Sequence, residues 1–301
     1  MTSTVAQYLG TTLPQRRGFH ANPTQMRYAE AIAEGLRSQG VHFHEAGTGI
    51  GKTLAYLLAI GEWVAQGKAE GRRCVVSTHS RSLQRQLMAD ENLDILNDYL
   101  ETQGLPTLTV GCRMGRQNYV SEARLALHLG AETLSEVLDD PDRSDAEKAL
   151  AEWAMDSDGC LLDLNPELLP EGLAFQDICL GSHEPLSESV RRHFEAVKGH
   201  DIVVLNHSLL ALDLVGGHKV TQMAPPYALL LDEAEHFPEA AEQVLSQQVS
   251  LLATTRLLRT MNLKAGEVWR NLLESLTDPR LSGEVQDCLL YTSPSPRDGL
   301  L

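Results

Sequence analysis

Glu45-Ala-Gly-Thr-Gly-Ile-Gly-Lys-Thr53 is the stretch that decides the fold. It follows a short run with alternating apolar residues, Val41–Ala46, which we expect to be a strand, and it opens an apolar stretch, Lys52–Ala65, which we expect to be a helix. The glycines let the main chain curl so that successive N–H groups face one phosphate at the positive end of that helix. The pattern therefore predicts a phosphate-binding loop (P-loop) and, with it, an α/β fold.

The P-loop residues have predicted roles around ATP and Mg²⁺. The Lys52 ammonium is expected to reach the β- and γ-phosphates, and the Thr53 hydroxyl is expected to ligate Mg²⁺. Ala46 stands where the usual motif has its first glycine. A glycine-rich turn that binds no ligand is the alternative. The residues expected to contact the nucleotide phosphates are Ala46, Gly47, Thr48, Gly49, Ile50, Gly51, Lys52 and Thr53.

An acidic pair, Asp232-Glu233, supplies the second half of the predicted site. It directly follows the apolar run Tyr227–Leu231. Because the carboxyl ends of parallel strands gather along one edge of a sheet, we expect Asp232 to lie beside the P-loop. Asp232 would then hold Mg²⁺ through water, and Glu233 would polarise the water that attacks the γ-phosphate. An acidic pair after a strand is common, so it indicates a nucleotide site only in combination with the P-loop upstream.

Apolar runs alternate with helical patterns along the rest of the chain. Short, continuously apolar runs bounded by polar residues fit strands that are buried on both faces of a parallel sheet. Together with the intervening helices, they predict a doubly wound parallel sheet. The expected strands are Arg73–Ser77, Thr107–Gly111, Asp201–Leu205 and Tyr227–Leu231, and the expected helices include Gln25–Leu36 and Ser82–Ala89.

Residues 118–199 differ from their surroundings, since they are acidic and are interrupted by Pro141, Pro166, Pro170 and Pro185. We expect a helical insertion there. The predicted organisation is then an ATP-binding domain in two parts, residues 1–117 and 200–287, the second part including helical sequence over Leu251–Leu276. Residues 288–301 change abruptly to a Ser/Pro-rich run, which we expect to be a non-native or disordered tail; a native linker is the alternative.

Composition narrows the possible classes of protein. The 301 residues carry a net charge of −16, which argues against a surface that coats nucleic acid everywhere but allows a local basic track. No apolar run is long enough to span a membrane, and the N-terminus has no secretory signal pattern, so a cytoplasmic location is expected. The five cysteines include no Cys-x-x-Cys pair, which argues against a zinc ribbon or a disulfide framework.

Four motifs in this order carry a family resemblance: the P-loop, Ser77-Thr-His-Ser-Arg-Ser-Leu-Gln-Arg-Gln-Leu87, Val204-Leu-Asn-His-Ser-Leu-Leu210 and Asp232-Glu-Ala-Glu-His236. Together they resemble the first motor domain of superfamily 2 helicases of the DinG/XPD/Rad3 type. The resemblance implies a RecA-like fold and ATP-driven 5′–3′ movement on single-stranded DNA, with unwinding of the duplex at a fork. It also implies an adenine-reading role for Gln25, and contacts with the DNA backbone at Thr78, His79, Asn206 and His207.

Some positions depart from the family pattern. Asn22 replaces an arginine, and Glu235 takes the fourth position of the DEAH box, with a histidine only at 236. Ser121 replaces the first cysteine of the family's iron–sulfur cluster, and too few cysteines remain nearby, so we expect no cluster. The stretch Gly115–Ser121, with serine at its end, resembles the corresponding stretch of the DinG-like helicase of type IV CRISPR systems. This resemblance implies a CRISPR ribonucleoprotein as a further partner.

No second set of α/β motifs follows residue 250, so we expect the second RecA-like domain of such motors to be absent from this sequence. Because that domain supplies arginine fingers in the family, we expect weak nucleotide binding and slow turnover from this chain. Two other functions stay open. One is a different P-loop enzyme, such as a nucleotide kinase. The other is a non-catalytic module that binds DNA or a protein complex.

Overall fold

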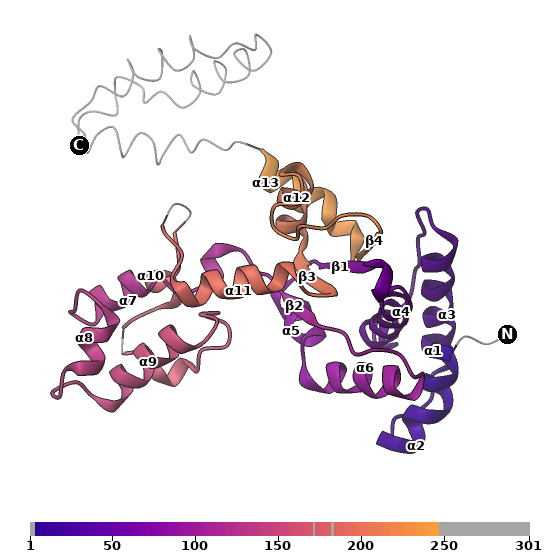
Figure 1. Cartoon of the computed structure of the whole chain (residues 1–301), viewed down its shortest axis with the longest axis horizontal. Helices are drawn as coiled ribbons and strands as arrows, with labels where there is room; N and C mark the ends of the chain where they lie inside the picture. The colour runs from indigo at the N-terminus through magenta and orange to yellow at the C-terminus, as the bar shows by residue number, and fades with distance from the viewer. Residues whose placement is uncertain (1–3, 171, 182–183, 247–301) are drawn as a thin grey trace, which may run out of the picture. The chain divides into compact units, whose positions relative to one another are not determined.

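Four short strands form a parallel sheet in the computed structural model, which describes residues 4–170, 172–181 and 184–246. The order of the strands in the sheet is β2-β3-β1-β4 (Figure 1). Their bounds are Arg73–Thr78 for β1, Val110–Cys112 for β2, Ile202–Asn206 for β3 and Tyr227–Leu231 for β4. The predicted α/β fold with a parallel sheet is therefore confirmed.

Helices precede and follow the strands in the sequence. Those before β1 are α1 (Thr4–Gln7), a π-helical turn (Tyr8–Thr12), α2 (Leu13–Arg17), α3 (Pro23–Ser38), α4 (Lys52–Gln66) and a 3₁₀ turn (Lys68–Glu70). Between β1 and β2 lie α5 (Arg81–Leu87) and α6 (Asp90–Thr102), and after β3 come α12 (His207–Val215) and α13 (Phe237–Leu245), the latter preceded by a 3₁₀ turn (Ala234–His236).

The central strands are buried on both faces because their side chains alternate between two hydrophobic clusters. In β1, Cys74 and Val76 pack in one cluster with α3, α4 and α6, whereas Val75 packs in the other with α12. In β3, Val204 packs in the first of these clusters and Val203 packs in the second. Strands covered on both faces are typical of α/β proteins with parallel sheets.

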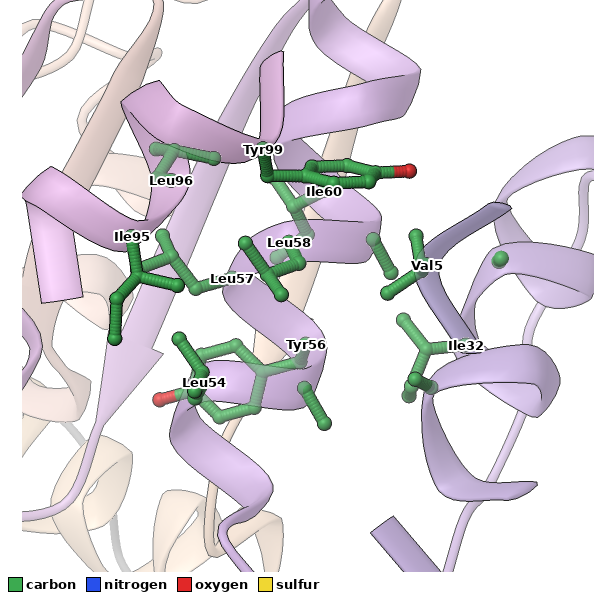
Figure 2. Close-up of a cluster of buried hydrophobic side chains, with 14 of the residues drawn as sticks. Val5, Ile32, Leu54, Tyr56, Leu57, Leu58, Ile60, Ile95, Leu96 and Tyr99 are labelled. Atoms are coloured by element: carbon green, nitrogen blue, oxygen red, sulfur yellow. The ribbon is translucent and has the colours of Figure 1, made fainter. Parts of the chain in front are cut away.

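Helix α4 is the centre of the larger cluster. Tyr56, Leu57 and Ile60 of this helix lie between side chains of α6 on one side and those of α1 and α3 on the other (Figure 2). The helices α4 and α6 approach closely at Gly61, where a Cβ atom would lie 2.3 Å from the Leu96 Cδ1 atom. This packing fixes the helix whose first residue is the P-loop lysine.

Residues 116–198 supply a group of short helices between β2 and β3. They are a 3₁₀ turn (Arg116–Asn118), α7 (Glu122–His128), α8 (Leu134–Asp139), α9 (Asp145–Asp156), a 3₁₀ turn (Pro166–Leu168), α10 (Phe175–Ile178) and α11 (Glu188–Lys198). The first helices of this group bury a hydrophobic cluster of their own, which includes Val120, Leu125, Leu150 and Ile178. The predicted boundaries of an insertion at 118 and 199 stay a prediction.

Three sequence expectations need correction. The strand predicted over Val41–Ala46 is wrong: these residues form neither helix nor strand, and Val41 and Phe43 are 83% and 90% exposed. The strand predicted over Thr107–Gly111 forms only at Val110–Cys112. Strand β4 is not buried on both faces, since Leu229 is 38% exposed.

Two further expectations fall on residues that the structure does not describe. The helical sequence over Leu251–Leu276 and the tail 288–301 lie outside the described residues. Within the described part of the chain, none of the helices has the length and apolar character that a membrane span needs.

The loop between α12 and β4 is held by one buried carboxylate, Asp213. Its oxygens accept hydrogen bonds from the Val220 N–H at 2.6 Å, the Thr221 N–H at 3.3 Å and the Thr221 hydroxyl at 2.6 Å. We expect Asp213→Ala to lower the free energy of unfolding by about 2–4 kcal/mol, because it leaves buried donors without an acceptor. Urea unfolding checks this, with the exposed Glu195→Ala as the control. A change as small as the control's would contradict it.

Candidate active site

The carboxyl ends of three strands lie side by side at one edge of the sheet. In the strand register, Ser77 of β1 is level with Leu205 of β3 and with Leu231 of β4. The residues that end each strand or directly follow it therefore meet there: Thr78 and His79, Asn206 and His207, and Asp232 and Glu233. This edge is the place where the sequence predicts the nucleotide site.

Gly51, in the P-loop, is the N-cap residue directly before helix α4. Gly51 has a φ of 80°, in the left-handed region, and no side chain caps the first N–H groups of the helix. A Cβ atom at Gly51 would lie 2.3 Å from the Gln25 side-chain nitrogen. Glycine is therefore favoured by the backbone conformation, and the end of the Gln25 side chain packs closely against it. The open helix end presents N–H groups and a positive partial charge to an anion.

Gln25 and Asn22 anchor helix α3 against the P-loop. The Gln25 Nε2 atom donates to the Gly51 carbonyl oxygen at 2.9 Å. Asn22 is the N-cap of α3, and its side-chain oxygen accepts from the Thr24 N–H at 2.9 Å. Asn22, which stands where the family has an arginine, thus caps helix α3. Gln25 lies beside the P-loop. The adenine-reading role of Gln25 stays a prediction.

Asp232 contacts the P-loop helix. The Tyr56 hydroxyl donates to the Asp232 Oδ2 atom at 3.1 Å, and both side chains are buried. Burial raises the pKa of the Asp232 carboxyl above its ordinary value, whereas the Tyr56 hydrogen bond and the Lys52 ammonium oppose that rise. The Thr53 hydroxyl in turn interacts with the Tyr56 phenol. The structure therefore brings Lys52, Thr53 and Asp232 to one place.

The donor set at this place fits Mg²⁺ bound to a triphosphate. A hydroxyl and a carboxylate are the hard oxygen ligands that Mg²⁺ prefers, and Mg²⁺ usually keeps several waters and phosphate oxygens as its other ligands. The Lys52 Nζ atom lies 3.4 Å from the Ala46 carbonyl oxygen, so the lysine side chain reaches back over the loop. These residues could hold the metal and the phosphates together, and this stays a proposal.

Glu233 has an unusual backbone. Its φ is 57°, in the left-handed region that residues other than glycine rarely adopt. Its carbonyl oxygen accepts from the His236 N–H at 3.0 Å and from the His207 Nε2 atom at 3.2 Å. The residue is half-buried, directly after the Asp232 carboxylate. Strained backbone of this kind clusters at functional sites.

The four residues predicted to contact DNA fall into two groups. Thr78 and His207 are 0% and 1% exposed, so their side chains are not accessible to a DNA backbone in this structure. Asn206 is half-buried and caps α12, accepting from the Leu209 N–H at 2.9 Å. His79 is exposed, and its ring lies 4.1 Å from that of His236. A direct DNA contact stays a prediction for His79 and Asn206.

Comparison with known proteins agrees with this geometry. Residues 22–117, which include the P-loop and β1, match the DEAD/DEAH box helicase family. The chain carries a DEAD/DEAH box helicase domain. The domain is homologous to DinG and YoaA helicases, as the motifs predict.

Three relatives illustrate the homology. The chain is 30% identical to the ATP-dependent helicase DinG of Mycobacterium tuberculosis (strain ATCC 25618 / H37Rv) over 87% of its own length and 39% of that protein. It is 26% identical to the ATP-dependent DNA helicase YoaA of Haemophilus influenzae over 91% of its length and 41% of that protein. It is 28% identical to the 3′-5′ exonuclease DinG of Bacillus subtilis over 82% of its length and 26% of that protein.

The chain thus spans between about a quarter and two fifths of the length of these relatives. The activity of a whole helicase and its partners are proposals for this chain. None of the three relatives is named for a CRISPR system, and that association stays a prediction.

Sequence reasoning missed two side chains of the site, Tyr56 and Ser77. Tyr56 lies three residues after Thr53 on one face of the same helix, so the spacing in the sequence was a signal that could have found it. Ser77 is a buried residue near the end of β1, and its hydroxyl contacts the His207 ring. No local pattern indicates a contact between residues so distant in the chain.

Ser121 and two cysteines, Cys160 and Cys179, lie in neighbouring segments of the chain. The Ser121 hydroxyl accepts from the Arg124 N–H at 3.3 Å and caps α7. Cys160 and Cys179 pair in isolated β-bridges with Tyr119 and Val120. Within the described ranges, no group of three or more His, Cys, Asp or Glu side chains could hold a metal ion. The expected absence of an iron–sulfur cluster stays a prediction.

Proposed function

We propose that this helicase domain binds Mg²⁺–ATP at the P-loop and hydrolyses it, and that hydrolysis drives movement on single-stranded DNA. The observation that carries the proposal is the contact of Asp232 with the P-loop helix, through the Tyr56 hydroxyl at 3.1 Å. A carboxylate beside Lys52 and Thr53 supports the proposal, because such sites need one group that binds the phosphates and others that bind the metal.

Each residue then has a role in the proposed reaction. The N–H groups at the start of α4 and the Lys52 ammonium bind the phosphates and offset their charge. Thr53 and Asp232 would hold Mg²⁺, which would supply positive charge to offset that of the phosphates. Glu233 orients the attacking water and accepts its proton. Gln25, beside the P-loop, reads the adenine.

DNA binding is proposed at the edge where His79 and Asn206 lie. Neutral donors suit phosphate oxygens, which position a strand without reading its bases. The name of one relative, an ATP-dependent DNA helicase, supports DNA as the substrate, and the family resemblance implies single-stranded DNA and the duplex fork. We further propose 5′–3′ movement, a cytoplasmic location and no iron–sulfur cluster, as the family resemblance and composition imply, with residues 118–199 as an insertion into the motor domain.

Hydrolysis under single-turnover conditions tests the proposal. Protein in excess over γ-labelled ATP and Mg²⁺ is expected to release phosphate, and a single-stranded oligonucleotide is expected to raise the rate severalfold. A nucleotide kinase would transfer phosphate to a small acceptor and would not respond to DNA. A non-catalytic module would bind ATP or DNA without releasing phosphate. Either of these two results would overturn the proposal.

A matched pair of variants checks the DNA side of the proposal. His79→Ala is expected to reduce the stimulation by single-stranded DNA, because His79 is the exposed side chain at the strand ends. His128→Ala removes an exposed histidine from α7 and is expected to leave the stimulation unchanged. Equal stimulation in both variants would remove His79 from the DNA contact.

A further inference from the structure

His207 is a buried histidine whose two ring nitrogens are both engaged. It is the first residue of α12 and is 1% exposed. Its Nδ1 atom lies 2.7 Å from the Ser77 hydroxyl oxygen, and its Nε2 atom lies 3.2 Å from the Glu233 carbonyl oxygen. The ring therefore joins the ends of β1 and β3 to the residue that follows Asp232.

The partners of the ring fix its tautomer. A carbonyl oxygen can only accept a hydrogen bond, so the Nε2 atom must carry a hydrogen and donate it to Glu233. In the neutral ring the Nδ1 atom then accepts, and the Ser77 hydroxyl donates to it. Burial lowers the pKa of His207 below its ordinary value, which favours this neutral form. Ser77 thus selects the orientation in which His207 holds Glu233.

The main chain of Glu233 needs such support. A left-handed conformation is unfavourable for a residue with a Cβ atom and persists only where the surroundings impose it. On one side, the Asp232 N–H donates to the Ser77 carbonyl oxygen at 2.8 Å. On the other, the His236 N–H donates to the Glu233 carbonyl oxygen at 3.0 Å. His207 is the side chain that ties this carbonyl to the rest of the sheet edge.

We propose that His207, oriented by Ser77, is a positioning residue that holds the Glu233 turn so that the Glu233 carboxylate faces the attacking water. This inference rests on the proposed ATP hydrolysis. It assigns His207 a place inside the site instead of a contact with DNA, in keeping with its burial. A displacement of about 1 Å in such a group can change a rate by about a hundredfold.

Three variants test the proposal by single-turnover hydrolysis and by ATP affinity. His207→Phe keeps a ring but removes both nitrogens, and we expect the hydrolysis rate to fall about tenfold or more with little change in affinity. His207→Gln restores an N–H donor near the Nε2 position, and we expect it to recover much of the rate. Ser77→Ala leaves the ring in place without its orienting donor, and we expect a smaller loss.

His193→Phe is the matched control. The His193 Nε2 atom also lies within hydrogen-bond distance of a main-chain carbonyl oxygen, that of Cys112 at 3.1 Å, and the residue belongs to α11. We expect it to lower the melting temperature without changing the rate of hydrolysis. If His207→Phe did the same, or if His207→Gln were as slow as His207→Phe, the positioning role would be overturned.

Hydrogen exchange at the His236 amide provides a readout that does not depend on ATP turnover. This amide donates to the Glu233 carbonyl, so loosening of the turn should speed its exchange. Faster exchange in both His207→Phe and Ser77→Ala supports the proposal, and unchanged exchange in Ser77→Ala overturns it. If the unaltered chain releases no phosphate, the proposed function fails, and the exchange rates still decide the role of His207.

Discussion

Replacing Glu233 with glutamine is expected to slow ATP hydrolysis by about 10²–10⁴-fold, the range typical for loss of a general base. Glutamine has the same shape and can still hold a water molecule, but it cannot accept a proton. Lys52, Thr53 and Asp232 are unchanged in this variant, so Mg²⁺–ATP should still bind. Single-turnover phosphate release measures the rate, and the fluorescence of a labelled ATP analogue measures the affinity.

Glu239→Gln is the control for this prediction. It makes the same chemical change at an exposed residue of α13 and should leave both rate and affinity as they were. A Glu233→Gln variant that hydrolysed ATP as fast as the control would show that another group takes the proton. A variant that lost ATP affinity instead would place Glu233 among the ligands of the nucleotide.

Local patterns were sufficient to predict the elements that carry the site. The predicted strand over Tyr227–Leu231 has the bounds of β4, and the predicted helix that begins at Lys52 is α4. Both depend on signals within a few residues: a continuous apolar run, and glycines followed by a helical pattern. The meeting of Asp232 with the P-loop helix follows from the topology of parallel strands, which is also a general rule.

The strand predicted over Val41–Ala46 shows where local patterns fail. Alternating Val41 and Phe43 favour a strand, but a strand forms only when another strand offers its N–H and C=O groups. In the described part of the structure, this segment pairs with no strand, and both apolar side chains are exposed. Pairing is a long-range property, so the alternation of residues cannot decide it.

The burial of the Thr78 and His207 side chains could not be predicted from the sequence either. Polar residues at the end of a strand are expected to face solvent or a ligand, yet both side chains are buried. The Ser77–His207 contact joins residues 130 positions apart, and the Tyr56–Asp232 contact joins residues 176 apart. Such polar networks depend on the final register of the strands, and only the structure reveals them.

Replacing Lys52 with alanine is expected to abolish the stabilisation of the chain by Mg²⁺–ATP. A ligand that binds only the folded state stabilises it by about 2.7 kcal/mol at a hundred times its Kd. Without the ammonium, the phosphates lose their charged donor, so the same ATP concentration should give almost no rise in melting temperature. Thermal unfolding with and without Mg²⁺–ATP measures the difference for each variant.

Lys52→Ala should also have a smaller effect on the stability of the chain without nucleotide, which thermal unfolding in the absence of ATP measures separately. Lys52 lowers the pKa of the buried Asp232 carboxyl, so its loss should slightly destabilise the ionised carboxylate and the nucleotide-free chain. Lys68→Ala is the control: it removes a lysine that pairs with Asp201 at 3.0 Å and should lower stability while keeping the full response to ATP. If Lys52→Ala kept that response as well, the P-loop would not be the nucleotide site.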